Sequence, residues 1–521
     1  MIVKIKKMIK NNIQILIVNF GGQYCHLIAR RIRDLGVYSG IVPYDITAKE
    51  IKEQNPKGII LSGGPSSVNK KNAPICDKNI LNLNIPILGI CYGHQLIAKL
   101  SKGKVSKGKI NEYGKKQLIV KATSLLKGLK TKEQAWMSHG DSVTRLPSQF
   151  NTLAKTDTCP IASFENIQKN LYGVQFHPEV VHTPKGKVVL KNFIFSICKS
   201  KKDYDIGNLK NKLIQEIKQT VGNTHVIMGA SGGVDSTVAA VLISKAIGKR
   251  LHCVFIDHGL IRKNELNSVK ERYKRFKLDV KYVDASKLFL RKLNKVTDPE
   301  KKRKIIGHAF IEVFENVAKK LRKKHNVKFL GQGTIYPDRI ESAQPSKQAD
   351  KIKSHHNLTL PEKMNLKVIE PLKDLYKDGV RELGEKLNIP KEILHRHPFP
   401  GPGLAIRILG EITPERLRIL READYIYIEE LIKTKQYYKI WQAFAALLPV
   451  KTVGVMGDAR TYEYLITLRA VTSKDAMTAD WAKIPNHILE KISNRIINEV
   501  KGANRIVYDI TQKPPGTIEY E

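Results

Sequence analysis

The chain has 521 residues, and its 90 Lys and Arg against 49 Asp and Glu give a formal net charge of +41. This length allows two to four domains with hydrophobic cores of their own, and 42% hydrophobic residues are typical of a globular protein. No apolar run is long enough to span a bilayer, so no membrane partner is expected. Six cysteines without a CxxC pair argue against a disulfide framework or a zinc site and favour a cytoplasmic protein with free thiols.

The excess positive charge has two interpretations. It favours a nucleic-acid partner if the basic side chains form one surface, or it reflects a composition rich in Lys, Ile and Asn. Basic residues spread along the whole chain, which favours the compositional interpretation and predicts no nucleic-acid partner. The basic run at 301–304 is accordingly expected to be a solvated helix face or loop, not a targeting signal.

The first two hundred residues alternate strand and helix patterns. Short β-rich runs at 13–20, 58–61 and 86–90 end in glycine or turn residues and are expected to be buried parallel strands. Helices are expected over 28–35 and 95–100. This alternation predicts a doubly wound α/β domain over 13–200, and the polar stretch 199–205 is expected to be a linker.

A second α/β pattern follows, with expected helices over 208–221 and from about 236, and expected strands at 225–228, 251–256 and 328–330. The polar, weakly periodic stretch 337–357 is expected to be a functional lid. The Pro/Gly-rich run 397–403 predicts a boundary. We therefore expect a second doubly wound parallel-sheet domain over 205–396 and a small α+β domain over 397–521.

A cysteine occupies a strand-to-helix turn in the first domain. The segment Gly89-Ile90-Cys91-Tyr92-Gly93 ends a strand, so Cys91 is expected on a tight elbow at the carboxyl edge of the sheet. The two glycines relieve crowding at such a turn, and the amino end of the helix favours the nucleophilic thiolate. A buried structural cysteine is the alternative, and the context favours a nucleophile.

Two further segments supply what a nucleophilic thiol needs. His177 and Glu179 lie at i and i+2 of an extended segment, so Glu179 is expected to orient His177, which moves the proton. Gly63 and Gly64 end another strand with exposed N–H groups, which suit an oxyanion hole or a simple turn. Over residues 13–200 these segments closely resemble the class I glutamine amidotransferases. The resemblance implies a triad of Cys91, His177 and Glu179 and an oxyanion hole at Gly63 and Gly64.

The second domain begins with a loop that suits phosphate. Between a strand and a helix lies Ser231-Gly232-Gly233-Val234-Asp235-Ser236-Thr237, where small residues and a helix amino end favour an anion. The loop lacks the lysine of a Walker A motif and resembles the PP-loop of ATP pyrophosphatases. The resemblance implies cleavage of ATP between its α- and β-phosphates, and the carboxylate of Asp235 suits Mg²⁺.

Further motifs extend the resemblance through essentially the whole chain. They include Lys353-Ser354-His355-His356-Asn357, the Pro/Gly-rich run 397–407, Trp441-Gln442 and the ending 513–521. A glutaminase joined to a PP-loop and these motifs resembles the glutamine-hydrolysing GMP synthetases. The resemblance implies three substrates: glutamine, ATP and xanthosine 5′-monophosphate (XMP). XMP is adenylated with release of pyrophosphate, and ammonia from glutamine displaces AMP to leave GMP, the last step of de novo guanine nucleotide synthesis.

The resemblance also implies parts for single residues. On the expected lid, Asp338, Glu341 and Lys353 are expected at the adenylation site, with Asp235 and Asp338 as ligands of Mg²⁺. Cations suit a monophosphate and an acid suits a ring N–H, and the residues expected to bind XMP are Arg262, Gln442, Lys513 and Glu519. A homodimer through the C-terminal domain is expected by the same resemblance.

Two alternatives stay open at this point. A PP-loop enzyme acting on tRNA would use the positive charge to bind RNA, and RNA affinity that falls steeply with salt would favour it. The built-in glutaminase nucleophile opposes this alternative. A non-catalytic scaffold made of the same modules is opposed by the intact Cys91, His177, Asp235 and Ser236.

Overall fold

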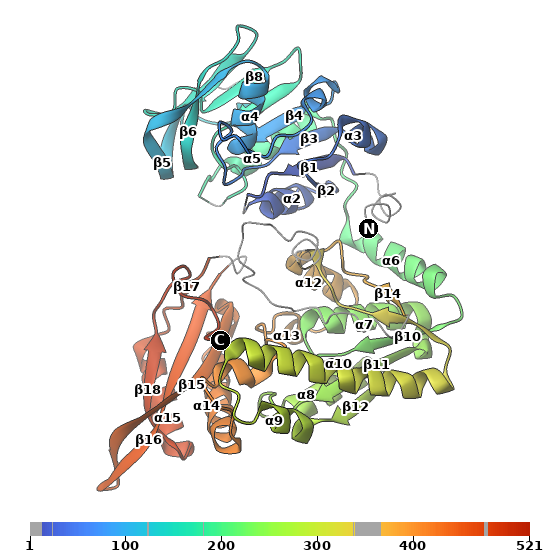
Figure 1. Cartoon of the computed structure of the whole chain (residues 1–521), viewed down its shortest axis with the longest axis vertical. Coiled ribbons are helices and arrows are strands. Elements are labelled where there is room, and N and C mark those ends of the chain that lie inside the picture. Colours follow the sequence, from blue (N-terminus) through green and yellow to red (C-terminus); the bar gives the residue numbers. More distant parts are fainter. Residues whose placement is uncertain are drawn as a thin grey trace. The chain divides into compact units, whose positions relative to one another are not determined.

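The structure is a computed structural model that describes residues 13–22, 24–121, 124–180, 182–336, 338, 366–473 and 478–521. The chain divides into two compact units, Met1–Asp205 and Ile206–Glu521, which run from blue to red in Figure 1. Among the described residues, no helix has the length and apolar character that crossing a membrane requires.

The first unit is built on a mixed nine-stranded sheet in the order β2-β1-β3-β4-β9-β8-β7-β5-β6. The strands from β2 to β9 in this order are parallel, and the remaining four continue the sheet antiparallel. Central strands β1, β3 and β4 are wholly buried, as parallel strands covered on both faces are. The strands are β1 (Ile15–Asn19), β2 (Ser39–Pro43), β3 (Gly58–Leu61), β4 (Ile87–Ile90), β5 (Lys104–Val120), β6 (Lys132–Arg145), β7 (Asn151–Lys155), β8 (Ser163–Asn166) and β9 (Leu171–Val174).

The helices of this unit are α2 (Cys25–Arg33), α3 (Ala48–Gln54), α4 (Tyr92–Leu100) and α5 (Gly186–Lys191), with short 3-10 helices at Lys78–Asn82 and Ser124–Leu126 and a π-helix at Asn192–Ile197. The parallel α/β pattern is confirmed, with helix boundaries within about three residues of those expected. The antiparallel half of the sheet was not predicted. Its long strand β5 is rich in Lys and Gly, which strand patterns disfavour.

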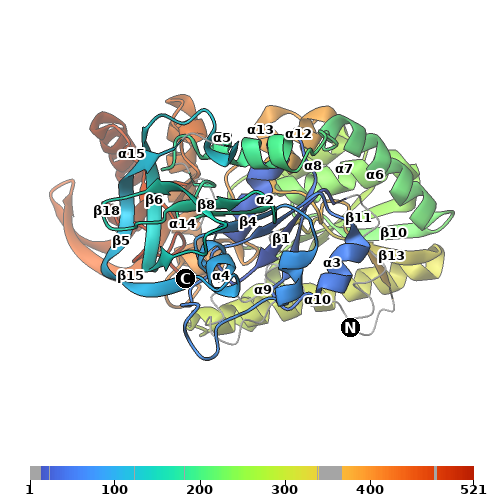
Figure 2. The same cartoon turned by 90° about the horizontal axis from the view of Figure 1, so that it is seen from above.

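The second unit contains a five-stranded parallel sheet in the order β12-β11-β10-β13-β14. In Figure 2, α7 and α12 lie on one side of this sheet and α10 on the other. This is the predicted doubly wound arrangement. Its elements are α6 (Ile206–Val221), β10 (His225–Gly229), α7 (Val234–Ile247), β11 (Leu251–Asp257), α8 (Glu265–Arg275), β12 (Val280–Asp284), α9 (Ser286–Leu293), α10 (Pro299–Lys324), β13 (Val327–Gly331), β14 (Lys367–Ile369), α12 (Lys377–Lys386) and α13 (Lys391–Leu394), with a 3-10 helix at Gly248–Arg250.

The rest of this unit is the predicted α+β part. A long antiparallel hairpin, β15–β16, pairs at one end with β17, and β18 runs parallel to β16. The elements are α14 (Pro414–Lys433), β15 (Gln442–Met456), β16 (Ala459–Thr472), β17 (Asp480–Trp481), α15 (Asn486–Glu499) and β18 (Ala503–Asp509), with 3-10 helices at Gly403–Arg407 and Tyr437–Lys439. One hydrophobic core joins the parallel sheet to this part, including Ile227, Leu330, Leu417 and Ile466.

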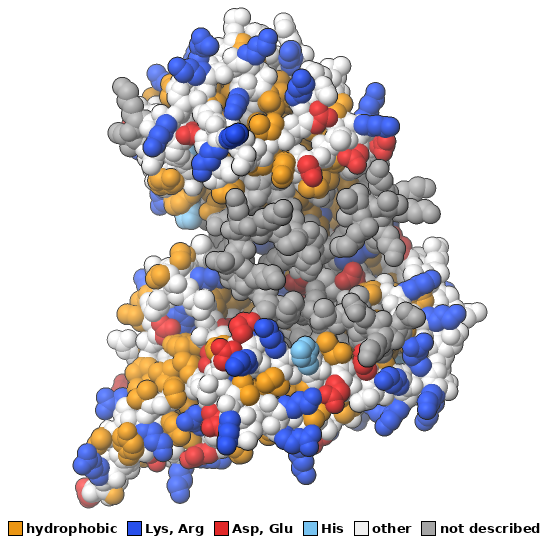
Figure 3. All heavy atoms as spheres, in the orientation of Figure 1, with side chains coloured by type: hydrophobic (Ala, Val, Ile, Leu, Met, Phe, Trp, Pro, Cys, Tyr) orange, Lys and Arg blue, Asp and Glu red, His pale blue; other side chains and the backbone are white. Residues whose placement is uncertain are grey.

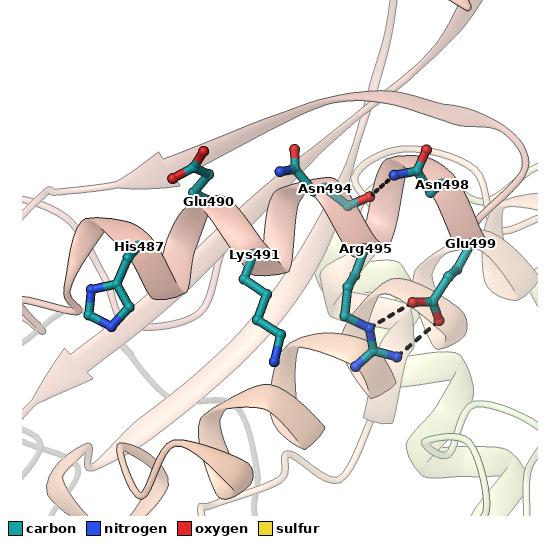
Figure 4. A pocket seen from close by; sticks show the side chains of 7 residues that line it. All are labelled: His487, Glu490, Lys491, Asn494, Arg495, Asn498 and Glu499. Atoms are coloured by element: carbon teal, nitrogen blue, oxygen red, sulfur yellow. Dashed lines mark hydrogen bonds and ion pairs between the residues drawn. The ribbon is translucent and has the colours of Figure 1, made fainter.

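Helices α14 and α15 are joined by ion pairs. Arg495 contacts Glu429 at 2.6 Å, Glu430 at 2.7 Å and Glu499 at 2.6 Å, and Lys491 contacts Glu430 at 3.0 Å. Figure 4 shows the shallow pocket that α15 lines beside these side chains. Because Lys491 and Arg495 of this pocket already pair with these carboxylates, we assign the pocket to helix packing and not to a ligand.

The end of the chain is tied to α10 by a buried lysine. Lys302 is fully buried, and its ammonium donates to the carbonyl of Ile408 at 2.7 Å and to the Glu521 carboxylate. Burial lowers the pKa of Lys302, and the Glu521 carboxylate opposes that shift. The expectation that the run 301–304 is solvated is therefore wrong at this position, because the first turn of α10 faces the tail.

We predict that Lys302→Met destabilises the second unit by about 3 kcal/mol, because it leaves the Glu521 carboxylate without its buried partner. Urea unfolding of the full chain measures this change. The exposed neighbour provides the control, since Lys301→Met should change stability by no more than about 0.5 kcal/mol. Equal midpoints for the two variants would contradict this reading of the tail contact.

Candidate active sites

Cys91 occupies the expected elbow. It follows β4 directly, has a left-handed backbone with φ 53°, and is the N-cap of α4. A side chain at Gly93 would place its Cβ 2.3 Å from the carbonyl oxygen of Leu61, so only glycine fits there. A non-glycine residue held at positive φ by such tight packing is typical of a functional site.

His177 lies beside this cysteine, in the segment after β9. Its Nδ1 is 2.7 Å from Oε1 of Glu179, and the thiol of Cys91 is close enough to act on the charge of the ring. Burial alone would lower the pKa of His177, but the charges of Glu179 and Cys91 outweigh it and raise this pKa well above its usual value. The arrangement therefore favours an imidazolium next to the sulfur, and the three expected triad residues are brought together.

The Gly63 loop reaches the same place. A Cβ on Gly63 would lie 3.3 Å from Cε1 of His177 and 3.7 Å from Cβ of Cys91. Gly64 packs against Phe20, whose carbonyl oxygen would be 2.9 Å from an added Cβ. The loop after β3 is thus in contact with the Cys91–His177 pair, which is where oxyanion donors are needed.

The backbone and an arginine also hold the three expected triad residues, and no sequence motif indicates either contact. The N–H of His177 donates to Trp136 O at 3.0 Å, and Arg31 donates to Glu179 O at 2.9 Å. Cys91 Sγ lies 3.6 Å from Ser138 O. Trp136 and Ser138 belong to β6, in the antiparallel half of the sheet, so no local motif could have linked them to Cys91.

The second histidine of the elbow has a different setting. His94 is fully buried, its Nε2 lies 3.1 Å from Ile161 O, and its ring stacks on Phe164. Burial lowers its pKa to about 3. A neutral, packed ring is a structural support for the elbow and not a base for Cys91.

The predicted phosphate loop lies between β10 and α7. Ser231 Oγ is 2.9 Å from Ser236 Oγ, and Thr237 Oγ1 donates to Gly233 O at 2.8 Å. Gly232 has φ 75°, a left-handed conformation that suits glycine. The first turn of α7 carries Val234 and Asp235, so the seven expected residues form one continuous turn at the carboxyl edge of the parallel sheet.

A set of side chains that the sequence did not reveal clamps this loop at Gly232. The Gly232 N–H donates to Tyr273 at 2.9 Å, and its carbonyl accepts from Arg396 at 3.2 Å and Arg272 at 3.3 Å. Both guanidiniums pair with Glu265, at 2.8 Å and 2.9 Å. The clamp comes from α8 and the segment after α13, far from the loop in sequence.

Carboxylates near the loop have the donor chemistry that Mg²⁺ prefers. Both oxygens of Asp235 accept from Lys377, at 2.8 and 2.7 Å, so this ammonium competes with any cation for the carboxylate. Asp338 Oδ2 accepts from Ile335 N at 3.1 Å, and the same segment packs on the start of α7, where a Gly333 Cβ would be 3.0 Å from Ser236 N. Asp338 is the one described residue of the expected lid, 337–357, and Glu341 and Lys353 lie outside the described residues.

Two of the four residues expected to bind XMP are in direct contact. Gln442 donates to Glu519 at 2.5 Å, and Arg407 makes a bidentate pair with Glu519 at 2.8 and 3.1 Å. Arg262 lies nearby, 3.1 Å from the carbonyl of Ala443, the next residue after Gln442. Lys513 pairs by its backbone with Ala479.

Buried groups surround this cluster. Arg262 pairs with Asp424 at 2.9 Å, and the guanidiniums of Arg262 and Arg407 both lie 5.2 Å from the ring centre of Phe399. His397 stacks on Tyr437 and donates from Nε2 to its carbonyl at 2.8 Å. Burial lowers the pKa of His397 to about 4, which keeps the ring neutral.

Comparison with known proteins places three family models on the chain. Residues 16–197 match Glutamine amidotransferase class-I, residues 206–329 match NAD synthase, and residues 429–520 match GMP synthase C terminal domain. The NAD synthase match covers only the α/β part of the second unit. A shared nucleotide-binding fold does not by itself imply a shared reaction.

Relatives match almost end to end. The GMP synthase [glutamine-hydrolyzing] of Aquifex aeolicus is 55% identical over 97% of this chain and 99% of its own length. The enzymes of the same name from Carboxydothermus hydrogenoformans and Brachyspira hyodysenteriae are 56% and 54% identical, each over 98% of this chain and 99% and 100% of their own. With this identity along nearly its whole length, the chain belongs to the family of glutamine-hydrolysing GMP synthases.

Proposed function

We propose that this chain makes GMP from XMP, with nitrogen from glutamine and with cleavage of ATP to AMP and pyrophosphate. The observation that carries the proposal is the joint presence of a buried Cys91–His177–Glu179 group and a strand-to-helix phosphate loop in one member of this family. Neither group alone would make GMP. The glutaminase needs a second site that uses its ammonia, and the PP-loop site needs ammonia as the nucleophile that displaces AMP.

The first unit would hydrolyse glutamine. Cys91 Sγ attacks the carboxamide carbon, and the N–H groups of the Gly63-Gly64 loop stabilise the oxyanion. His177, protonated beside Glu179, gives its proton to the leaving ammonia. It then takes a proton from the water that cleaves the thioester and releases glutamate.

The second unit would adenylate XMP. The backbone of residues 231–236 and the amino end of α7 would hold the pyrophosphate part of ATP. Asp235 and Asp338 would hold Mg²⁺, which neutralises phosphate charge when bound. The base carbonyl oxygen of XMP attacks the α-phosphorus, pyrophosphate leaves, and ammonia then displaces AMP at the base carbon.

The remaining expected residues fit around this reaction. Arg262 would bind the phosphate of XMP. Glu519, held by Gln442 and Arg407, would accept a hydrogen bond from the base of XMP. We keep Lys513, together with Glu341 and Lys353 of the lid, as part of the proposal on the family resemblance alone. The three domains 13–200, 205–396 and 397–521 belong to it as well.

The decisive assay supplies XMP, ATP, Mg²⁺ and glutamine and measures AMP, pyrophosphate and GMP. We expect all three products in equal amounts from the native chain. Cys91→Ala should lose GMP formation with glutamine yet keep it with added ammonium, because the two reactions use separate sites. No XMP-dependent pyrophosphate would overturn the proposed function, and loss of both nitrogen sources in Cys91→Ala would contradict separate sites.

Removal of the Glu179 charge should change the pH profile. Because this carboxylate raises the pKa of His177, Glu179→Gln lowers that pKa and moves the alkaline limb of kcat/KM for glutamine hydrolysis to lower pH. Glu53→Gln, at an exposed position of α3, is the matched control and should keep the native profile. An unmoved alkaline limb in Glu179→Gln would show that the carboxylate does not set the titration.

The exposed end of the β15–β16 hairpin supports a homodimer. Tyr462 pairs across the ladder with Val453, and Val455 and Met456 follow toward the turn, with exposed fractions of 64%, 45%, 76% and 36%. Apolar surface gathered on one ribbon is typical of an interface. We include dimerisation through this ribbon in the proposal.

Val455→Asp should shift the chain from dimer to monomer, because a charge would be buried at the interface. Analytical ultracentrifugation over a range of protein concentrations measures the change. Ile167→Asp, at an equally apolar exposed site in the first unit, should leave the native mass unchanged. A native chain that stays monomeric at all concentrations would refute the dimer.

The distribution of basic side chains and the state of the cysteines bear on the partners and the location of the enzyme. On the face shown in Figure 3, Lys and Arg are scattered among acidic and neutral side chains and form no single stripe, which gives the tRNA alternative no support from this face. All six cysteines are free and buried, and this suits the reducing cytoplasm, where we place the enzyme.

A further inference from the structure

Three histidines meet at the amino-terminal edge of the parallel sheet in the second unit. His225 begins β10, His252 is the second residue of β11, and His325 follows the last residue of α10 just before β13. One ring nitrogen from each lies within 4.8 Å of the other two. The ring centroids are 5.2, 5.0 and 4.6 Å apart.

Hydrogen bonds set the orientation of the central ring. His252 Nδ1 lies 2.9 Å from Oδ2 of Asp279, a carboxylate that can only accept, so Nδ1 carries the proton. His252 Nε2 therefore offers a lone pair, which accepts a hydrogen bond from Nδ1 of His225 at 2.9 Å. A bound ion would take the place of this shared proton, because a neutral His225 can carry its proton on Nε2 instead. A carboxylate that fixes the tautomer of a histidine in this way is the usual outer partner of a metal-binding imidazole.

The surroundings of the other two rings suit an ion. His252 is buried, whereas His225 and His325 are partly open to solvent, so an ion could reach the cluster from solvent. Zn–N bonds of about 2.0–2.1 Å separate tetrahedral donors by about 3.3 Å, so small ring rotations, largest at the exposed His325, would complete the site.

A second cluster of side chains that could bind a metal shows how a closed site differs from the histidine cluster. Glu112, His139 and Cys159 also approach one another in the first unit, and all are buried. Here the Glu112 carboxylate already accepts from His139 at 2.9 Å and from Thr156 at 2.6 Å, and also from Thr158. That cluster is a closed hydrogen-bond network, with no route for an ion.

We infer that His225, His252 and His325 bind one late first-row divalent ion, of which Zn²⁺ is the representative, with Asp279 as the positioning residue for His252. Imidazole nitrogens are the donors that such ions prefer. The strand β10 is five residues long and separates the cluster from the phosphate loop by roughly 15 Å. The ion would therefore be structural and would join β10 and β11 to the end of α10. Binding of this ion does not depend on the proposed reaction.

Metal binding to the full chain, stripped with a chelator and free of nucleotide, tests the inference. We expect one equivalent of Zn²⁺ by elemental analysis after gel filtration. Co²⁺ in its place should give the visible absorption of a tetrahedral site. Zn²⁺ at about 100 times its Kd should raise the unfolding temperature of the second unit by roughly 5–10 °C.

Three variants locate the ion. His325→Asn removes an exposed ligand at a helix end, where Asn is tolerated, and should abolish both the equivalent of Zn²⁺ and the thermal shift. Asp279→Asn should weaken binding about 10- to 100-fold. His308→Asn, an exposed histidine of the same helix, should bind as the native chain does. Equal unfolding temperatures of the stripped proteins would confirm that the variants fold.

Two results would overturn the inference. The first is a failure of Zn²⁺ to bind at these histidines, seen either as no stoichiometric binding in the native chain or as unchanged binding in His325→Asn. The histidines would then be a hydrogen-bonded stack. The second is a sulfur-to-cobalt charge-transfer band that disappears in Cys91→Ser, which would assign the ion to the glutaminase thiol.

Discussion

Both candidate sites depend on one constraint: a strand buried on both faces of a parallel sheet leaves polar backbone and side chains accessible only where it ends. β4 turns into α4 at Cys91, and β10 turns into α7 through residues 230–233. Each turn is so tight that glycine is required, at Gly93 by contact with Leu61 and at Gly232 by its positive φ. The same amide-rich helix start then favours a thiolate in one unit and a phosphate in the other.

The last residues of the chain form a second organising feature. Glu519 is held by Arg407 and Gln442, and Glu521 is held by the buried Lys302. These charged groups would be costly to bury alone, and their pairing explains why the tail lies against α10 and β15. The tail thereby joins the α/β part and the C-terminal sheet, consistent with the single hydrophobic core that they share.

Opposite edges of the parallel sheet in the second unit have different chemistry. Its carboxyl edge presents the phosphate loop and Asp235, and its amino edge presents the three histidines. Cysteine spacing predicts no zinc site in this chain. The three histidines lie far apart in the sequence and meet only because β10, β11 and the end of α10 are neighbours in the fold, so no spacing pattern reveals them.

The sequence by itself determined the parts whose chemistry is local. Cys91 at its elbow, the pair His177 and Glu179 and the loop 231–237 were all visible as short motifs, because residues within one turn or strand end are positioned by their own backbone. Tertiary structure alone decided which distant groups support them. Trp136 behind His177, the Arg396 clamp on Gly232 and the buried Lys302 come from other elements, and their contacts arise from packing over long sequence separations, which no local pattern encodes.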